Sequence, residues 1–149
     1  MEIKICKSNE ILPLRMSVLR PGRPVEEGMF PGDEDEATFH LGLYENGKLT
    51  SIASFYKENK EGIEGEGYRL RSMATDPAFQ GKGYGKRILD FGITELRSRN
   101  IDYLWCNART TAMGFYRHFG FEVISEEFEI PTIGPHYELA LQLKQPQND

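Results

Sequence analysis

Cysteine is scarce in this sequence, because its 149 residues include only Cys6 and Cys106. Each lies in a short apolar run far from the other, so the two do not form the closely spaced pair of a metal knuckle or a redox motif. The three histidines, His40, His118 and His136, are not spaced like metal ligands either. We therefore expect two reduced cysteines in the core and no metal site.

Long hydrophobic runs are absent as well. No segment approaches the ~20 consecutive apolar residues that a membrane-spanning helix needs. The first residues, Met1–Ile5, alternate polar and apolar side chains as in a strand, and they lack the apolar core of a signal peptide. Since the length is typical of one domain, we expect residues 1–149 to form a single soluble domain in the cytoplasm, without a membrane partner.

An excess of basic residues is also missing, because 18 Lys and Arg are outnumbered by 23 Asp and Glu, for a formal net charge of −5. Binding along a nucleic-acid backbone needs clustered positive charge, so we expect no nucleic-acid partner. A local exception is the group formed by Lys82, Lys86 and Arg87, which collect beside three glycines. An anion would be favoured there.

Hydrophobic periodicity and turn residues divide the chain into helices and strands. Helical spacing of apolar residues predicts helices over Ser8–Leu19, with the helix proper starting around Pro13, and over Gly83–Arg99 and Thr111–Phe119. The expected strands are Met1–Ile5, Phe39–Tyr44, Leu49–Tyr56, Gly67–Thr75, Ile101–Ala108, Glu122–Phe128 and Tyr137–Leu143. Asn46-Gly47 predicts a hairpin turn, and the Pro- and Gly-rich segment Arg20–Glu36 is typical of a long loop. The order β-α-β-β-β-α-β-α-β-β indicates a mixed α/β fold.

The strand Gly67–Thr75 has an irregular pattern, because its apolar side chains change phase between Leu70 and Met73. A β-bulge near Arg71 and Ser72 explains the slip, and bulges often lie beside active sites. A strand buried on both faces explains the pattern equally well.

A glycine-rich turn follows that strand and opens the next helix. Gly81, Gly83 and Gly85 let the backbone approach a ligand closely, and the N–H groups of a helix N-terminus favour a diphosphate. The glycine spacing fits neither the dinucleotide fingerprint Gly-x-Gly-x-x-Gly nor the Walker loop. The anion is therefore expected to belong to another kind of ligand.

Two motifs resemble those of a known family. Gln80, Gly83 and Gly85 match Gln/Arg-x-x-Gly-x-Gly/Ala, the pyrophosphate-binding motif of GNAT N-acyltransferases. The segment Ala112–Phe121 is similar to the family's Ala-x-x-Phe-Tyr-x-x-x-Gly-Phe signature, at the expected distance. Arg109 departs from the pattern, since many relatives have Asn there. The resemblance covers essentially the whole chain and identifies it as a member of the GNAT superfamily.

This resemblance implies acetyl-CoA as the cofactor and a splayed central sheet, in which the bulged strand and the strand Ile101–Ala108 open an acetyl-CoA cleft. Backbone groups near the bulge would bind the pantetheine arm, and the amide at or near Met73 would polarise the thioester carbonyl. Asn107 is a further expected contact to the arm, or else a simple strand-end turn former. The cofactor-binding residues implied in this way are Met73, Ala74, Thr75, Gln80, Gly81, Lys82, Gly83, Tyr84, Gly85, Lys86 and Asn107.

The implied reaction is transfer of an acetyl group to the primary amine of a small molecule, by direct attack in a ternary complex. Tyr116 is the expected general acid, although it also fits a core aromatic on its helix face. The general base stays open between a water chain, Glu26, Glu27 and His40.

Three residues are candidates to bind the amine acceptor. Arg69 or Arg71 would bind an acceptor carboxylate, with His40 as a further candidate contact, whereas surface ion pairs are the alternative role of the two arginines. Because the base is open, a non-catalytic acyl-CoA-binding module with the same fold is an alternative function. The assembly stays open between a monomer and a homodimer.

Overall fold

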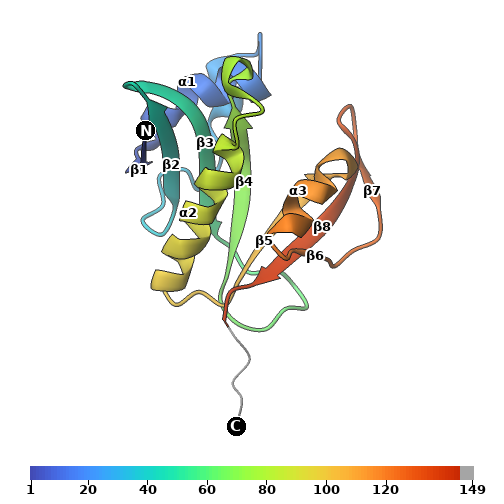
Figure 1. Ribbon diagram of the computed structural model, residues 1–149. Coiled ribbons are helices and arrows are strands. Elements are labelled where there is room, and N and C mark those ends of the chain that lie inside the picture. Colours follow the sequence, from blue (N-terminus) through green and yellow to red (C-terminus); the bar gives the residue numbers. More distant parts are fainter. Residues whose placement is uncertain (145–149) are drawn as a thin grey trace. The chain divides into compact units, whose positions relative to one another are not determined.

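The computed structural model describes residues 1–144, which form eight strands and three α-helices in a mixed α/β order (Figure 1). The helices are α1 (Ser8–Leu19), α2 (Tyr84–Ser98) and α3 (Met113–His118), and short 3-10 turns are η1 (Val25–Gly28), η2 (Pro77–Phe79) and η3 (Thr110–Ala112). The strands are β1 (Glu2–Cys6), β2 (Phe39–Glu45), β3 (Lys48–Lys57), β4 (Gly67–Thr75), β5 (Tyr103–Arg109), β6 (Glu122–Val123), β7 (Phe128–Ile130) and β8 (Gly134–Gln142). The predicted fold class is confirmed.

The sheet is hydrogen-bonded in the order β1-β2-β3-β4-β5-β8-β6, and β7 pairs with β8. By its internal contacts the chain divides into two compact units. The first unit comprises Met1–Lys57 and Leu70–Glu95, and the second comprises Glu58–Arg69 and the chain from Leu96 onward. The expectation of one domain over residues 1–149 stays a prediction, as does the expected cleft.

An antiparallel hairpin is the centre of the first unit. β2 pairs with β3 from Phe39↔Phe55 to Glu45↔Lys48, and β1 adds to the other edge of β2. The hairpin turn places Asn46 and Gly47 at φ values of 50° and 79°, which two-residue primed turns require. The hairpin predicted from Asn-Gly is therefore confirmed.

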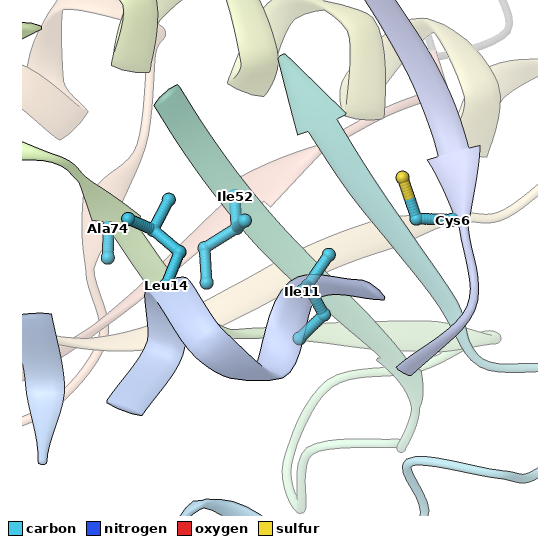
Figure 2. Packing of buried hydrophobic residues seen from close by; sticks show 5 residues of the cluster. All are labelled: Cys6, Ile11, Leu14, Ile52 and Ala74. Atoms are coloured by element: carbon cyan, nitrogen blue, oxygen red, sulfur yellow. The ribbon is translucent and has the colours of Figure 1, made fainter. Parts of the chain in front are cut away.

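The two long helices cover opposite faces of this hairpin. Side chains alternate between the faces of a strand, so Ile52 and Phe55 of β3 point to opposite sides. Ile52 belongs to the cluster under α1, whose members are Cys6, Ile11, Leu14, Ile52 and Ala74 (Figure 2). Phe55 lies under α2, where a Cβ added to Gly92 would be only 2.2 Å from the Phe55 ring. Gly92 therefore lets α2 approach β3 closely.

Helix α1 begins earlier than its proline suggests. The helix starts at Ser8, because the Lys7 amide donates to Glu10 Oε1 (2.8 Å) and the Glu10 amide donates to the Lys7 carbonyl (3.0 Å). Pro13 consequently lies inside the helix rather than at its start, which corrects the expectation that the helix proper starts around it. Having no N–H, Pro13 leaves the Asn9 carbonyl without its usual helical partner.

The second unit is organised around β5. This strand is parallel to the start of β4, with Gly67–Arg69 paired to Tyr103–Trp105, and antiparallel to β8 along its whole length. The loop that precedes β4 covers one face of β5, where the Trp105 indole donates to the Glu58 carbonyl (2.9 Å) and the Lys60 amide donates to the Tyr103 hydroxyl (2.7 Å).

The strand predicted over Glu122–Phe128 is wrong as a single element. It is divided into β6 and β7, both of which pair with β8. Between them the Glu138 carbonyl accepts from the Ile124 amide (2.9 Å), but the Glu138 amide donates to the Ser125 hydroxyl (2.8 Å), so a side chain takes one place in the backbone ladder. Strand β8 begins at Gly134, because Gly134 pairs with Ile130.

Candidate active site

The glycine-rich turn joins β4 to α2 as predicted. The Asp76 carboxylate accepts from the Ala78 amide (2.9 Å) and caps η2, after which the chain reaches the start of α2 at Tyr84. Gly81 and Gly83 both have a φ of 80°, and a Cβ added to either would meet nothing within 4 Å. Conformation rather than crowding therefore requires glycine at both positions, and the backbone between them is open to a ligand.

Aromatic and amide contacts hold this turn in place. The Phe79 ring stacks on Tyr84, with centroids 6.3 Å apart, and the Lys82 ammonium lies 5.2 Å from the Phe79 centroid. The side-chain Nε2 of Gln80 donates to the Thr75 carbonyl (3.3 Å). The first N–H groups of a helix have no intrahelical partner, and those of α2 lie in this glycine-rich segment. The exposed Lys86 lies in the first turn of the same helix. The turn is suited to bind an anion.

An irregularity in β4 lies where the sequence predicts it. Ser72 has a φ of 57°, the left-handed conformation, in the middle of an otherwise extended strand. Ala74 is buried after it, and Met73 and Thr75 are half-buried, with the Thr75 hydroxyl 2.8 Å from that of Ser51. The Met73 amide therefore directly follows a residue that leaves strand geometry.

Tyr116 belongs to the second unit, on α3. Its ring packs edge-on against Phe115 and Phe121, with centroids 5.1 Å and 5.4 Å away. Burial raises the pKa of the phenol well above its ordinary value, and negative charge on Cys106 would raise it further. Burial also raises the pKa of the Cys106 thiol to about 12. Tyr116 therefore stays protonated and can donate a hydrogen bond, but the raised pKa makes it a weaker acid, and Cys106 stays a thiol rather than a nucleophile. Met113, which periodicity did not place on the inner face, is the buried residue of α3.

Asn107 has a buried oxygen that no other residue satisfies. Within residues 1–144, Asn107 Oδ1 and Arg69 Nε are the two buried side-chain polar atoms without a hydrogen-bond partner. Leaving such an atom unpaired costs about 1–3 kcal/mol. Asn107 lies on β5 opposite Glu138, and its free acceptor fits an amide N–H of a bound pantetheine arm. This orphaned atom is the feature of the second unit that best fits the implied cofactor.

The two arginines predicted to bind the amine substrate both contact other residues of the protein. Arg69 Nη1 lies 3.5 Å from a Glu58 carboxylate oxygen, and the guanidinium stacks over Trp105 at 4.8 Å. Arg71 lies over the Phe30 ring at 4.7 Å. The ion-pair alternative is therefore present for one end of Arg69, whereas its Nε still has no partner among the described residues.

The candidates for a general base lie in the first unit. His40 is buried, with Nδ1 2.7 Å from the Ser54 hydroxyl and Nε2 2.9 Å from the Asp33 carbonyl. Glu27 forms an exposed ion pair with Arg23, and Glu26 is exposed in η1. None of these contacts in the described part of the chain selects a base, so the base and the acceptor contact of His40 stay predictions.

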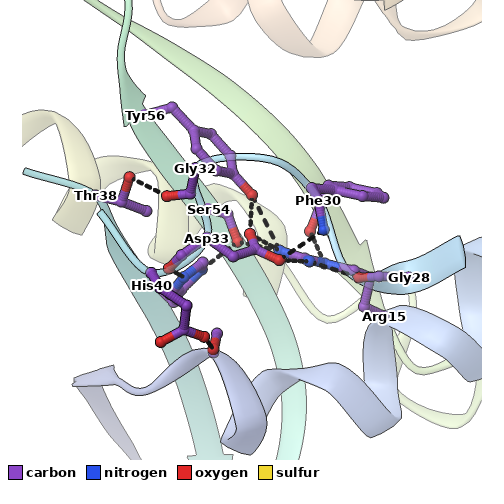
Figure 3. Close-up of polar contacts among 12 residues, drawn as sticks. Arg15, Gly28, Phe30, Gly32, Asp33, Thr38, His40, Ser54 and Tyr56 are labelled. Carbon is purple, nitrogen blue, oxygen red and sulfur yellow. Dashed lines mark hydrogen bonds and ion pairs between the residues drawn. The ribbon is translucent and has the colours of Figure 1, made fainter. Parts of the chain in front are cut away.

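Sequence reasoning missed a buried arginine cluster in the first unit (Figure 3). Arg15 is completely buried on the inner face of α1, where its guanidinium pairs with Asp33 at 2.7 Å. Burial by itself would raise the pKa of Asp33, but hydrogen bonds from Arg15, Tyr56 and the Phe30 amide outweigh it and lower that pKa. A charged residue beside the apolar Ile11 and Leu14 positions was the signal that could have found this cluster.

Two kinds of feature are absent from the described residues. No helix there is long and apolar enough to span a membrane. No group of His, Cys, Asp and Glu side chains there could hold a metal ion.

The sequence is similar to those of known proteins. Residues 9–121 match the acetyltransferase (GNAT) family. The chain is 33% identical over 137 residues to the uncharacterized N-acetyltransferase YitI of Bacillus subtilis, an overlap that covers 91% of this chain and 92% of that relative. It is also 29% identical over 101 residues to the ribosomal protein bS18-alanine N-acetyltransferase of Escherichia coli, covering 66% and 64% of the two chains.

Solved structures show the same fold. An aminoglycoside 6′-N-acetyltransferase in complex with coenzyme A superposes with a TM-score of 0.73 over all of both chains, at 14% sequence identity.

Proposed function

Because the chain belongs to the acetyltransferase (GNAT) family, we propose that it is an acetyl-CoA-dependent N-acetyltransferase that modifies a primary amine. The observation that carries the proposal is the turn from Gln80 to Lys86, whose backbone is open and whose two glycines have positive φ at the start of α2. A diphosphate is the ligand that such a turn suits. Coenzyme A contains one, and it is bound in the aminoglycoside acetyltransferase of the same fold.

Different residues would bind different parts of coenzyme A. Backbone N–H groups from Gln80 to Lys86 would hold the diphosphate, with Lys82 adding positive charge. Backbone groups of Met73 and Thr75 would pair with the amides of the arm, and Asn107 Oδ1 would accept one further hydrogen bond. Acetyl-CoA supplies the acetyl group in activated form, as a thioester.

Two groups of the chain would act on the reaction itself. The Met73 amide would donate to the thioester carbonyl oxygen of bound acetyl-CoA, where negative charge develops, and a fixed backbone donor suits that role. Tyr116 would act as the general acid, by donating a hydrogen bond and then its proton to the departing sulfur. The attacking amine must be neutral, and the group that removes its proton is left open among water, Glu26, Glu27 and His40.

A small amine that carries a carboxylate is the acceptor we propose first. The unpaired Arg69 Nε supports this choice, because a guanidinium binds carboxylates well. A protein α-amino group is the second candidate, since one relative is named for acetylating an alanine of a ribosomal protein. We place the reaction in the cytoplasm.

An assay of thiol release separates these alternatives from an acyl-CoA-binding module. The purified protein is incubated with acetyl-CoA and a panel of amino acids, polyamines and short peptides that begin with alanine. Release of thiol that depends on the acceptor supports the enzyme. Tight binding of acetyl-CoA without acetylation of any amine would favour the binding module instead.

A further inference from the structure

Arg15 is the most completely enclosed charged side chain of the first unit, with none of its surface exposed. It donates hydrogen bonds to groups on four other parts of the chain. These acceptors are the Ser72 hydroxyl (2.8 Å), the Gly28 carbonyl (2.8 Å), the Asp33 carboxylate (2.7 and 3.2 Å), the Ser54 hydroxyl (3.0 Å) and the Tyr56 hydroxyl (3.2 Å). The guanidinium thus joins α1 to η1, to the loop before β2 and to β3 (Figure 3), and also to β4 through Ser72.

The charge of Arg15 is balanced by Asp33, which is itself held on several sides. Asp33 also accepts from the Tyr56 hydroxyl (2.5 Å) and from the Phe30 amide (2.9 Å), and the Phe30 ring lies 4.3 Å from the guanidinium. A buried ion pair with such complete hydrogen bonding has one arrangement rather than several. Arg15 Nε is therefore presented to Ser72 from a fixed position.

Ser72 is the residue that needs such support. Its φ of 57° is left-handed, a conformation that costs a non-glycine residue roughly 1–2 kcal/mol. The Arg15 Nε–Ser72 Oγ bond ties this residue to a buried, charge-balanced cluster. Without that bond, a more extended conformation of Ser72 would rotate the peptide plane that carries the Met73 amide.

We infer that Arg15 is a positioning residue for acetyl transfer, which fixes Ser72 in its left-handed conformation and so orients the Met73 N–H for the reacting carbonyl. This inference rests on the proposed function, because it assigns Arg15 a role at the same site. Arg15 acts only through Ser72 and contacts neither reactant. A role confined to stability predicts that every acceptor of Arg15 matters equally, whereas a positioning role predicts that Ser72 matters far more for turnover.

Two hydroxyls of the cluster make this distinction testable. Ser72→Ala and Tyr56→Phe each remove one hydroxyl that accepts from Arg15, at 2.8 Å and 3.2 Å, but Ser72 lies on β4 and Tyr56 on β3. We expect Ser72→Ala to lower kcat at least tenfold, while the affinity for coenzyme A changes less than threefold. Tyr56→Phe should keep kcat within about twofold of wild type, with at least as large a loss of thermal stability, because the Tyr56 hydroxyl also donates to Asp33. Equal kcat in the two variants would overturn the inference.

A second measurement does not depend on turnover. The backbone amide resonance of Met73 is recorded by NMR in the ligand-free wild type and in both variants. A large shift in Ser72→Ala, with little change in Tyr56→Phe, supports the positioning role, and an unmoved Met73 resonance in Ser72→Ala contradicts it. If the wild type neither binds nor consumes acetyl-CoA, the proposed function fails, whereas the Met73 resonance still tests whether Arg15 orients this amide.

Discussion

The two units treat their buried polar groups in opposite ways. In the first unit, Arg15 and Asp33 are buried or nearly so, and each forms several hydrogen bonds with the protein. In the second unit, Asn107 Oδ1 and Arg69 Nε are buried without a partner in the described part of the chain. Burial of a polar atom is costly unless the atom is bonded, so a satisfied cluster and an orphaned atom have different purposes.

This contrast separates architecture from ligand binding. The hydrogen bonds of the Arg15 cluster are formed within the protein, and they stabilise the shape of the loop before β2 and of the irregular strand β4. The orphaned atoms of the second unit are available to a ligand. Substitutions in the cluster should therefore lower stability, and at Ser72 turnover as well, whereas substitutions at the functional groups of the second unit should lower binding or turnover with little loss of stability.

The largest expected effect is on turnover in Tyr116→Phe. This variant keeps the ring that packs against Phe115 and Phe121 and removes only the hydroxyl. Loss of a positioned general acid should lower kcat by about 10²–10⁴-fold, with nearly unchanged affinity for acetyl-CoA. The measurement is steady-state thiol release at saturating acetyl-CoA, beside a thermal melt of both proteins. Wild-type kcat in the variant would mean that Tyr116 is only a core aromatic.

The next effect is the loss of stability in Arg15→Met. Removal of the guanidinium leaves Asp33 buried without its counter-charge, which should destabilise the fold by about 3–5 kcal/mol. Arg23→Met is the matched control, because Arg23 also pairs with a carboxylate, that of Glu27, but the two side chains are 61% and 40% exposed. Urea unfolding should show little change in the control. Similar losses in both variants would contradict the contrast between buried and exposed pairs.

A smaller effect concerns cofactor affinity in Gly83→Ala. Gly83 has a φ of 80°, and Gly47 of the hairpin has 79°, and neither would place a Cβ against another residue. Both Ala variants should therefore lose about the same stability, on the order of 1 kcal/mol, from the left-handed conformation. Calorimetry should show weaker acetyl-CoA binding, by about tenfold or 1.4 kcal/mol, in Gly83→Ala alone. Equal affinity in the two variants would remove the turn from the binding site.

The smallest effect is the stability change in Asn107→Ala. The Asn107 Oδ1 atom accepts no hydrogen bond from the described residues, so the substitution removes none. Asn59 Oδ1 in the same unit accepts from the Gly67 amide (2.8 Å). Asn59→Ala should thus lose about 1–3 kcal/mol of stability and Asn107→Ala clearly less. Calorimetry should show the opposite order for coenzyme A, with weaker binding in Asn107→Ala only. The reverse pattern would make Asn107 an ordinary structural residue.

Local patterns of the sequence were sufficient for much of the fold. The helix Ser8–Leu19, the Asn46-Gly47 hairpin and the turn into α2 depend on residues close together in the chain, and each was predicted correctly, except that α1 starts before Pro13. The irregularity at Ser72 was also visible, as a change of phase in the strand. The division of residues 122–130 into β6 and β7 was not, because it accompanies a side-chain hydrogen bond of Ser125 to Glu138 on another strand.

In the candidate site, too, local motifs could be identified from the sequence, whereas contacts between distant residues could not. Motif residues such as Gln80, Gly83 and Tyr116 were identified through the resemblance of their segments to the family's motifs, and their functional roles stay predictions. The Arg15 cluster escaped notice because its partners Asp33 and Ser72 are far from it in sequence. No local pattern reports a hydrogen bond formed only after the chain has folded.

The most direct test of the account is product analysis after incubation with acetyl-CoA and the amine panel, with thiol release and the mass of each amine recorded together. The account predicts stoichiometric release of coenzyme A and addition of one acetyl group to the nitrogen of at least one primary amine. It also predicts that Tyr116→Phe greatly slows both signals. Binding of acetyl-CoA without acetylation of any amine, including peptides that begin with alanine, would contradict the central claim.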